Sequence, residues 1–280
     1  MPALALLPLF EPQNLGWLAM WSVAGAEFLL LKFLTLRTHA AGVPVSRVAA
    51  YVTLWPGMNA ASFLRAGNAG TEAKRPAIAE MIVALANFSL GAGFAAWAIW
   101  NAWTEPPLLV AWAGMLGIIF SLHFGALHVV SWLWRRAGFA APPIMRAPIA
   151  ARSLTEFWAE RWNIAFAESA RRLLLRPLGR RWGARPAAAF VFLISGLIHE
   201  SVISLPARGG WGGPTLYFLL QAAGAWFEKT PAGRRLGLGA GWRGRTWTLT
   251  VAATPLPLLF HAPFAERVIV PMFRFLKEVL

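Results

Sequence analysis

Long apolar runs separated by charged loops make up most of this chain. A helix that crosses a bilayer needs about 20 mostly apolar residues, and the hydrophobic pattern predicts about seven such spans. They cover residues 15–36, 77–103, 108–134, 187–205, 214–227, 246–260 and 265–276. The proline-interrupted string TPLPLLFHAPF favours a broken helix near the last two. We therefore expect an all-α polytopic membrane protein, with residues 1–280 forming a single domain.

Basic side chains are frequent in the first, third and fifth loops between these spans and nearly absent from the second and fourth. The basic loops hold Arg37, Arg47, Arg65, Lys74 and Arg75; then Arg135, Arg136, Arg146, Arg152, Arg161, Arg171, Arg172, Arg176, Arg180, Arg181 and Arg185; and finally Lys229, Arg234, Arg235, Arg243 and Arg245. The positive-inside rule then predicts an outside N-terminus and cytoplasmic basic loops. Because the rule accounts for most of the net charge of +14, we expect membrane lipids as partners and no nucleic acid.

Composition narrows the chemistry and the location. The chain is 58% hydrophobic with 16 Trp, a residue favoured at membrane interfaces, and it has no Cys. Disulfides, thiolate metal sites and a cysteine nucleophile are therefore excluded. Abundant Ala and Arg, scarce Lys and short loops favour a bacterial plasma membrane.

The third loop is too long and too patterned to be a simple connection. Ser153 and Glu156 have the spacing of a capping box, which marks the start of a helix. Apolar and charged residues then alternate irregularly from Phe157 to Leu175. We expect one or two amphipathic helices at the cytoplasmic face.

The predicted span 187–205 carries the polar string ISGLIHESV at residues 194–202. An ionisable pair such as His199 and Glu200 is costly inside a bilayer and by default indicates function. On a helix Ser195 and His199 share one face, and Gly196 leaves room for a neighbouring helix or a ligand. The alternative is a polar contact between helices.

Other candidate residues are ambiguous when taken singly. Trp158, Trp162 and Asn163 would suit an interfacial helix, and Arg161 would suit a lipid headgroup. The cluster Arg171, Arg172, Arg176, Arg180 and Arg181 indicates either attraction to anionic lipid or docking of a phosphorylated donor. His123 and His128 are five residues apart, off helical register, so no metal site is expected.

Several strings taken together resemble the membrane-bound O-acyltransferase superfamily, and its wax-synthase-like branch in particular. In chain order they are LWPGMNAASF, FWAERWN, SGLIHE, YFLLQAAGAWFE and PLPLLFHAPFAERVIVPM. They extend from residue 54 to residue 272 and follow one another in the order found in that family. The resemblance implies spans and amphipathic helices that enclose an intramembrane reaction chamber. Ala159 and Glu160 replace the usual Gly-Arg, and Ile198 replaces Met, which leaves the substrate open.

The resemblance also implies transfer of a fatty acyl group from acyl-CoA to the hydroxyl of a lipophilic alcohol, with no further cofactor. The family pair would correspond to His199 and Asn163. A neutral His is a competent base for the hydroxyl proton, and the Asn amide could hold the thioester carbonyl. Glu200 or Ser195 could orient the imidazole or a neighbouring helix. Without Cys, we expect direct transfer, with CoA arriving at the Arg-rich face.

Three alternatives stay open at this point. The acceptor could be a sterol or a diacylglycerol. The protein could instead be a proton-coupled transporter using Glu27, His199 and Glu200, which predicts internal repeat symmetry that the sequence does not clearly show. It could also be a lipid-binding protein without catalysis.

Overall fold

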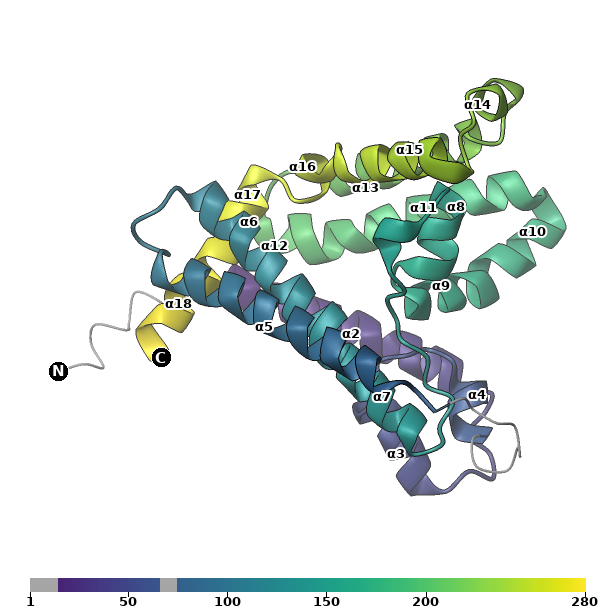
Figure 1. The fold of residues 1–280 in the computed structure, drawn as a ribbon, viewed down its shortest axis with the longest axis horizontal. Helices are drawn as coiled ribbons and strands as arrows, with labels where there is room; N and C mark the ends of the chain where they lie inside the picture. The colour runs from purple at the N-terminus through teal and green to yellow at the C-terminus, as the bar shows by residue number, and fades with distance from the viewer. Residues whose placement is uncertain (1–14, 66–74) are drawn as a thin grey trace.

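The computed structural model describes residues 15–65 and 75–280, and within these ranges the chain is helical with no strand (Figure 1). Lys74 lies outside the described residues. The prediction of an all-helical chain is confirmed for the part described, and the helices include several π-helical segments, in which the backbone is wound more widely than in an α-helix.

Four helical runs are long and apolar enough to cross a membrane. They are α2 (Gly16–Leu36), α5 (Ile78–Trp100), the run α6–η3–α7 (Pro107–Ile118, Ile119–Ala126, Leu127–Arg136) and the run α11–η7–α12 (Ala184–His199, Glu200–Ser204, Leu205–Ala207). These four correspond to four of the predicted spans. Together with the basic-loop pattern they indicate an integral membrane protein.

The other three predicted spans are not confirmed. Residues 214–227 form α13 (Gly213–Phe227), which at 15 residues is shorter than a membrane crossing requires. Residues 246–260 and 265–276 fall in two helical stretches, Gly241–Leu259 and Ala262–Val279, which meet at an angle of 62° and count as one broken span at most. Pro255, Pro257 and Pro263 account for the break, because each removes a backbone donor. The described residues thus contain four candidate spans, or five.

These two stretches consist of short helices. The first contains α15 (Gly241–Ala253) and α16 (Leu256–Leu259), and the second contains α17 (Ala262–Phe264), η8 (Ala265–Ile269) and α18 (Val270–Val279).

The basic third loop folds into a series of short helices beside α11 (Figure 1). They are η4 (Pro148–Ala150), α8 (Leu154–Glu156), η5 (Phe157–Arg161), α9 (Ile164–Ala170), η6 (Arg171–Leu175) and α10 (Arg176–Trp182). The remaining short helices are α3 (Val45–Thr53), α4 (Ala60–Arg65) and α14 (Pro231–Arg235). The expected amphipathic helices are therefore divided into short pieces.

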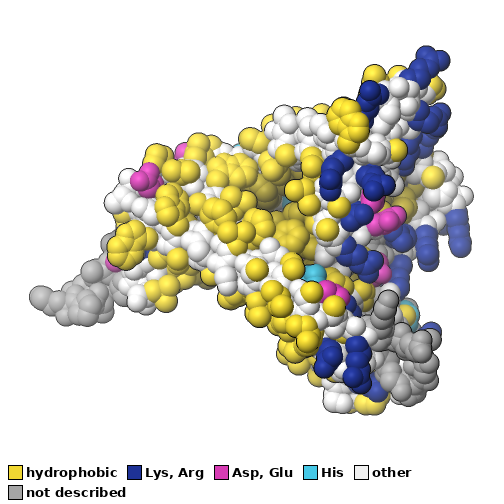
Figure 2. Space-filling model, viewed as in Figure 1, with side chains coloured by type: hydrophobic (Ala, Val, Ile, Leu, Met, Phe, Trp, Pro, Cys, Tyr) yellow, Lys and Arg dark blue, Asp and Glu magenta, His cyan; other side chains and the backbone are white. Residues whose placement is uncertain are grey.

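Charge is segregated along the long axis of the molecule. Figure 2 shows apolar side chains over the middle of the molecule and most Lys and Arg side chains at one end. That end carries α10 and α14, whereas the C-terminal end of α18 lies at the opposite end (Figure 1). This distribution is typical of a membrane protein that obeys the positive-inside rule.

A buried lysine connects α3 and the loop after it to the first candidate span, α2, through hydrogen bonds. Lys32, on α2, is 1% exposed, and its Nζ donates to the carbonyl oxygens of Tyr51 (2.8 Å), Trp55 (2.5 Å) and Gly57 (2.6 Å). An ammonium group has three donors, so these carbonyls satisfy it fully. The Nζ also lies 3.7 Å from the centroid of the Tyr51 ring. This arrangement allows a charged residue to be buried without an acidic partner.

Replacing this lysine tests the attachment. Lys32→Met preserves length but leaves three carbonyls without their donor, at a cost of about 1–3 kcal/mol for each one that stays unpaired. We expect a clearly lower midpoint of thermal unfolding in detergent. Lys229→Met, at an exposed position, should leave the midpoint unchanged. Equal midpoints for the two variants would contradict the role assigned to Lys32.

Candidate active site

His199 is the last residue of α11, directly before the π-helical segment η7. Its Nδ1 lies 2.7 Å from the backbone carbonyl oxygen of Ser195. A carbonyl oxygen only accepts, so Nδ1 carries a proton and donates it, and in the neutral ring the lone pair is on Nε2. The ring packs against Phe218 of α13, with 4.5 Å between centroids. The sequence thus positions an imidazole whose Nε2 can accept a proton.

Ser195 acts through its backbone. Its hydroxyl donates to the carbonyl oxygen of Val191 at 2.9 Å, so it is the Ser195 carbonyl that determines the His199 tautomer. The predicted shared face of Ser195 and His199 is present. Gly196, the next residue, packs directly on α13, since a Cβ there would lie 2.7 Å from the Cα of Thr215.

Glu200 binds the first turn of α13. Its Oε1 accepts from the backbone N–H of Thr215 (3.1 Å) and from the Thr215 hydroxyl (3.0 Å). Its Oε2 is buried and has no hydrogen-bond partner in the described part of the chain. A carboxylate is favoured at a helix N-terminus, where backbone N–H groups are free. Glu200 therefore holds α13 against α11, one turn before Phe218 reaches His199.

Other polar residues of η7 face other neighbours. The Ser201 hydroxyl donates to Oε1 of Glu27 on α2, and the Ser204 hydroxyl lies 3.2 Å from Nε2 of His261. The Nδ1 of His261 accepts from the backbone N–H of Phe264, so its Nε2 is the donor to Ser204 when the ring is neutral. Within the described residues, none of these bonds connects Glu27 to His199.

The segment FWAERWN begins at a capped helix. The Ser153 hydroxyl accepts from the N–H of Glu156, as the capping-box spacing predicted (3.0 Å). Glu228, at the end of α13, adds a second cap: its Oε2 accepts from the N–H of Leu154 (2.9 Å), and its Oε1 accepts from the N–H and hydroxyl of Thr155 (3.3 and 3.1 Å). The motif is thereby attached to the helix that contacts His199.

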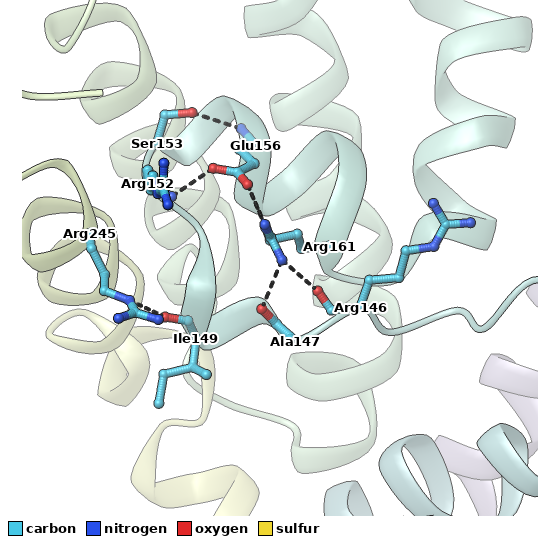
Figure 3. A network of polar contacts seen from close by, with 8 residues as sticks. All are labelled: Arg146, Ala147, Ile149, Arg152, Ser153, Glu156, Arg161 and Arg245. Carbon is cyan, nitrogen blue, oxygen red and sulfur yellow. Dashed lines mark hydrogen bonds and ion pairs between the residues drawn. The ribbon is translucent and has the colours of Figure 1, made fainter. Parts of the chain in front are cut away.

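Arg161 is part of the motif's scaffold. Its guanidinium pairs with Glu156 at 2.6 Å and also donates to the carbonyl oxygens of Arg146 and Ala147 (Figure 3). Glu156 in turn accepts from the N–H of Arg152 at 2.7 Å. The Arg152 N–H, and after it the Arg161 guanidinium, hold the pKa of Glu156 below its usual range.

Trp158 connects the motif to the histidine. Its Nε1 donates to Oε1 of Gln221 at 3.3 Å, and its ring contacts Phe218 at 5.5 Å between centroids. Trp158 and His199 therefore share Phe218 as a neighbour. Trp162 points elsewhere: it stacks on Phe157 at 5.6 Å and lies edge-on to Phe124 at 6.4 Å.

Asn163 has a left-handed backbone (φ 40°) and is the N-cap of α9. Asn tolerates this conformation better than most residues. Its Oδ1 accepts from the N–H of Phe166 at 3.3 Å, while bonds from Arg146 N to Arg161 O (2.8 Å) and from Ile164 N to Ile144 O (2.9 Å) fix the chain on either side. Its Nδ2 has no partner, and no hydrogen bond joins Asn163 to His199, in the described ranges.

The five arginines of the predicted donor-docking cluster have different surroundings in the structure. Arg171 donates to the carbonyl oxygen of Ala159 (3.3 Å), and Arg172 donates to Oδ1 of Asn59 (2.9 Å). Arg176, Arg180 and Arg181 are exposed on α10, and none of them forms an ion pair in the part of the chain described. The helix α10 lies at the basic end of the molecule (Figures 1 and 2).

Two hollows stand out in the described part of the chain. One hollow of about 10 Å³ lies beside Trp55, Asn59 and Glu168, and an open apolar groove of about 470 Å³ runs between α13 and α15. Neither is lined by His199 or Asn163. The reaction chamber stays a prediction.

Several residues of this site were not singled out from the sequence. Phe218 and Gln221 lie on α13 and Glu228 is its C-cap, and all three are in the string YFLLQAAGAWFE. A signal was present, because Gln221 and Glu228 are polar residues seven apart in an apolar run and therefore share one helix face. Asn59, the partner of Arg172, had no comparable signal.

Residues 141–220 match the membrane bound O-acyl transferase family. The matched segment contains FWAERWN, His199 and Glu200, and the match supports membership of that superfamily. None of the curated proteins matches this chain. The family implies acyltransferase activity in a membrane.

The Glu156 contacts predict a pH dependence of stability. Because the pKa of this carboxyl is lowered in the folded chain, its contribution is complete above the usual glutamate range and disappears as the pH falls through the lowered value. Glu156→Gln should therefore be less stable than wild type near neutral pH, by about 1–2 kcal/mol, and equal to it in strong acid. Thermal unfolding in detergent across pH measures this difference, with the exposed Glu105→Gln as control. A gap that widens in acid would refute the assignment.

Proposed function

We propose that the protein transfers a fatty acyl group from acyl-CoA to the hydroxyl of a lipophilic alcohol within the membrane, as a wax-ester synthase does. The main support is the hydrogen bond from His199 Nδ1 to the Ser195 carbonyl oxygen. This bond leaves Nε2 as the basic atom of a neutral imidazole, placed beside the aromatic ring of Phe218. Such a group can act as a general base.

The reaction follows from these groups. Nε2 takes the proton of the alcohol as its oxygen attacks the thioester carbon, and a tetrahedral intermediate forms. The C–S bond then breaks, and the imidazolium returns the proton to the CoA sulfur, giving an ester and free CoA. The Nδ2 of Asn163 supplies a hydrogen bond to the developing oxyanion. Its Oδ1 is occupied in capping α9.

The acceptor and donor are assigned to opposite environments. The alcohol dissolves in the bilayer, where the spans place His199. The donor is charged, and we place it at the basic end, where the cluster Arg171, Arg172, Arg176, Arg180 and Arg181 can bind phosphate groups. We assign that end to the cytoplasm of a bacterial cell, with the N-terminus outside. Sterols and diacylglycerol are the alternative acceptors.

Removing the base tests the function directly. Membranes that contain the protein, supplied with labelled acyl-CoA and a panel of alcohols, should form labelled ester. His199→Ala should lower the rate by about 10²–10⁴-fold while accumulating to the wild-type level, because general-base catalysis contributes that much. His39→Ala, outside the candidate site, is the control. Full turnover by His199→Ala would exclude the mechanism, and no ester from any alcohol would exclude the function.

The two roles of Asn163, which are capping α9 and donating a hydrogen bond to the oxyanion, can be tested separately. Asn163→Asp keeps an oxygen that caps α9 and tolerates the left-handed backbone, but it loses the amide donor. We expect a folded protein whose kcat is lower by about 10²-fold, the usual cost of losing one oxyanion donor. Asn101→Asp is the matched control. Asn101 lies at the C-terminal end of α5, away from α9, and its amide donates to the carbonyl oxygen of Trp97 in that same helix. An unchanged kcat for Asn163→Asp would confine Asn163 to capping.

A further inference from the structure

His123 lies in η3, the π-helical middle of the span Pro107–Arg136. Its Nδ1 is buried and has no hydrogen-bond partner among the described residues. A buried polar atom without a partner costs about 1–3 kcal/mol, and such atoms in native proteins call for an explanation. One such explanation is a ligand that supplies the missing hydrogen-bond partner.

The packing of η3 determines which way His123 faces. Gly117 and Gly125 lie against α5, because a Cβ at either would be within 2.8 Å of the backbone of Ala95 or Phe88. Ser121 is on the same side, since a Cβ at Gly91 of α5 would lie 2.2 Å from the Ser121 nitrogen. His123 is two residues beyond Ser121 and therefore on the roughly opposite side of the helix.

The neighbouring side of η3 meets the FWAERWN motif. Phe124, the residue after His123, packs edge-on to Trp162 at 6.4 Å between centroids, and Trp162 directly precedes Asn163. Phe124, Leu127, Phe28 and Trp162 pack on one buried apolar cluster. These contacts join η3, the helix that carries His123, to the segment that carries one of the two proposed catalytic residues.

The π-helical backbone of η3 also indicates that this segment has a functional role. The described chain has five π-helical segments: η6 and η8, and three others, which are η3, η5 within the motif and η7 directly after His199. Single π-helical turns inside α-helices are frequent at functional sites. The three segments belong to three separate parts of the sequence, and the first of them carries no residue assigned to the reaction above.

We propose that His123 binds the hydroxyl group of the acceptor alcohol, an inference that rests on the proposed function. A hydroxyl both donates and accepts, so it satisfies Nδ1 in either tautomer of the ring. The thioester carbonyl only accepts, and the Asn163 amide already serves it. The position of His123 in the middle of a candidate span suits an acceptor dissolved in the bilayer.

The test compares two expected effects of one substitution, on the stability of the protein and on its affinity for the alcohol. His123→Phe removes the unpartnered atom, so the midpoint of thermal unfolding without ligand should be unchanged or higher. At the same time the KM for the alcohol should rise roughly 3- to 10-fold, the value of one neutral hydrogen bond, with kcat changed less than about twofold. His123→Asn keeps a polar atom in the δ position and should recover most of the affinity.

His128→Phe is the matched control, because His128 lies in the same span and faces Glu80, with 4.0 Å between Nε2 and Oε2. It should leave the KM unchanged. If His123→Phe also leaves the KM unchanged, or if it lowers stability without a selective change in KM, the assignment of His123 is wrong even though the transfer reaction stands.

A binding measurement separates this inference from the proposed function. The rise in unfolding midpoint caused by added alcohol reports binding without turnover. If the wild type transfers no acyl group but shows this rise, and His123→Phe abolishes it, the binding role is supported while the function fails. If the wild type shows no rise at any soluble concentration of alcohol, the binding role is refuted.

Discussion

Two glutamate side chains close helix N-termini inside this bundle, and the arrangement of the candidate site depends on them. Glu200 binds the first turn of α13, and Glu228, at the other end of α13, binds the first turn of α8. N–H groups buried in the protein have no water to bind, so other protein groups must satisfy them. As a result α13 is held at both ends, and Phe218 in between contacts both Trp158 and His199.

The π-helical segment after His199 distributes polar side chains among different neighbours. Glu200 reaches α13, Ser201 reaches Glu27 of α2, and Ser204 reaches His261 before α17. One short stretch of backbone therefore contacts three other parts of the fold through hydrogen bonds. Because these bonds form in an apolar environment, where an unmade bond is costly, they restrict how α11 can rotate and so determine where the imidazole faces.

Local contacts were predictable from spacing, whereas long-range ones were not. The spacing of Ser153 and Glu156 predicted the cap, and the four-residue interval between Ser195 and His199 predicted their shared face. The contact of Trp158 with Gln221, 63 residues later in the chain, has no local signal. The predicted bounds of residues 214–227 agree with α13 to within one residue, but a helix of 15 residues is too short to be confirmed as a span. The acyltransferase resemblance agrees with the family match over residues 141–220, while the enclosed chamber stays a prediction.

The bond between Leu154 and Glu228 joins residues 74 positions apart, and this has a consequence for biosynthesis. A ribosome completes FWAERWN well before it reaches Glu228, so the nascent segment waits without its second cap. Only when α13 has left the translocation machinery and packed beside α11 can α8 be fixed. Assembly of this part of the molecule is therefore a late event of translation, and a chain released before Glu228 lacks the second cap of the motif.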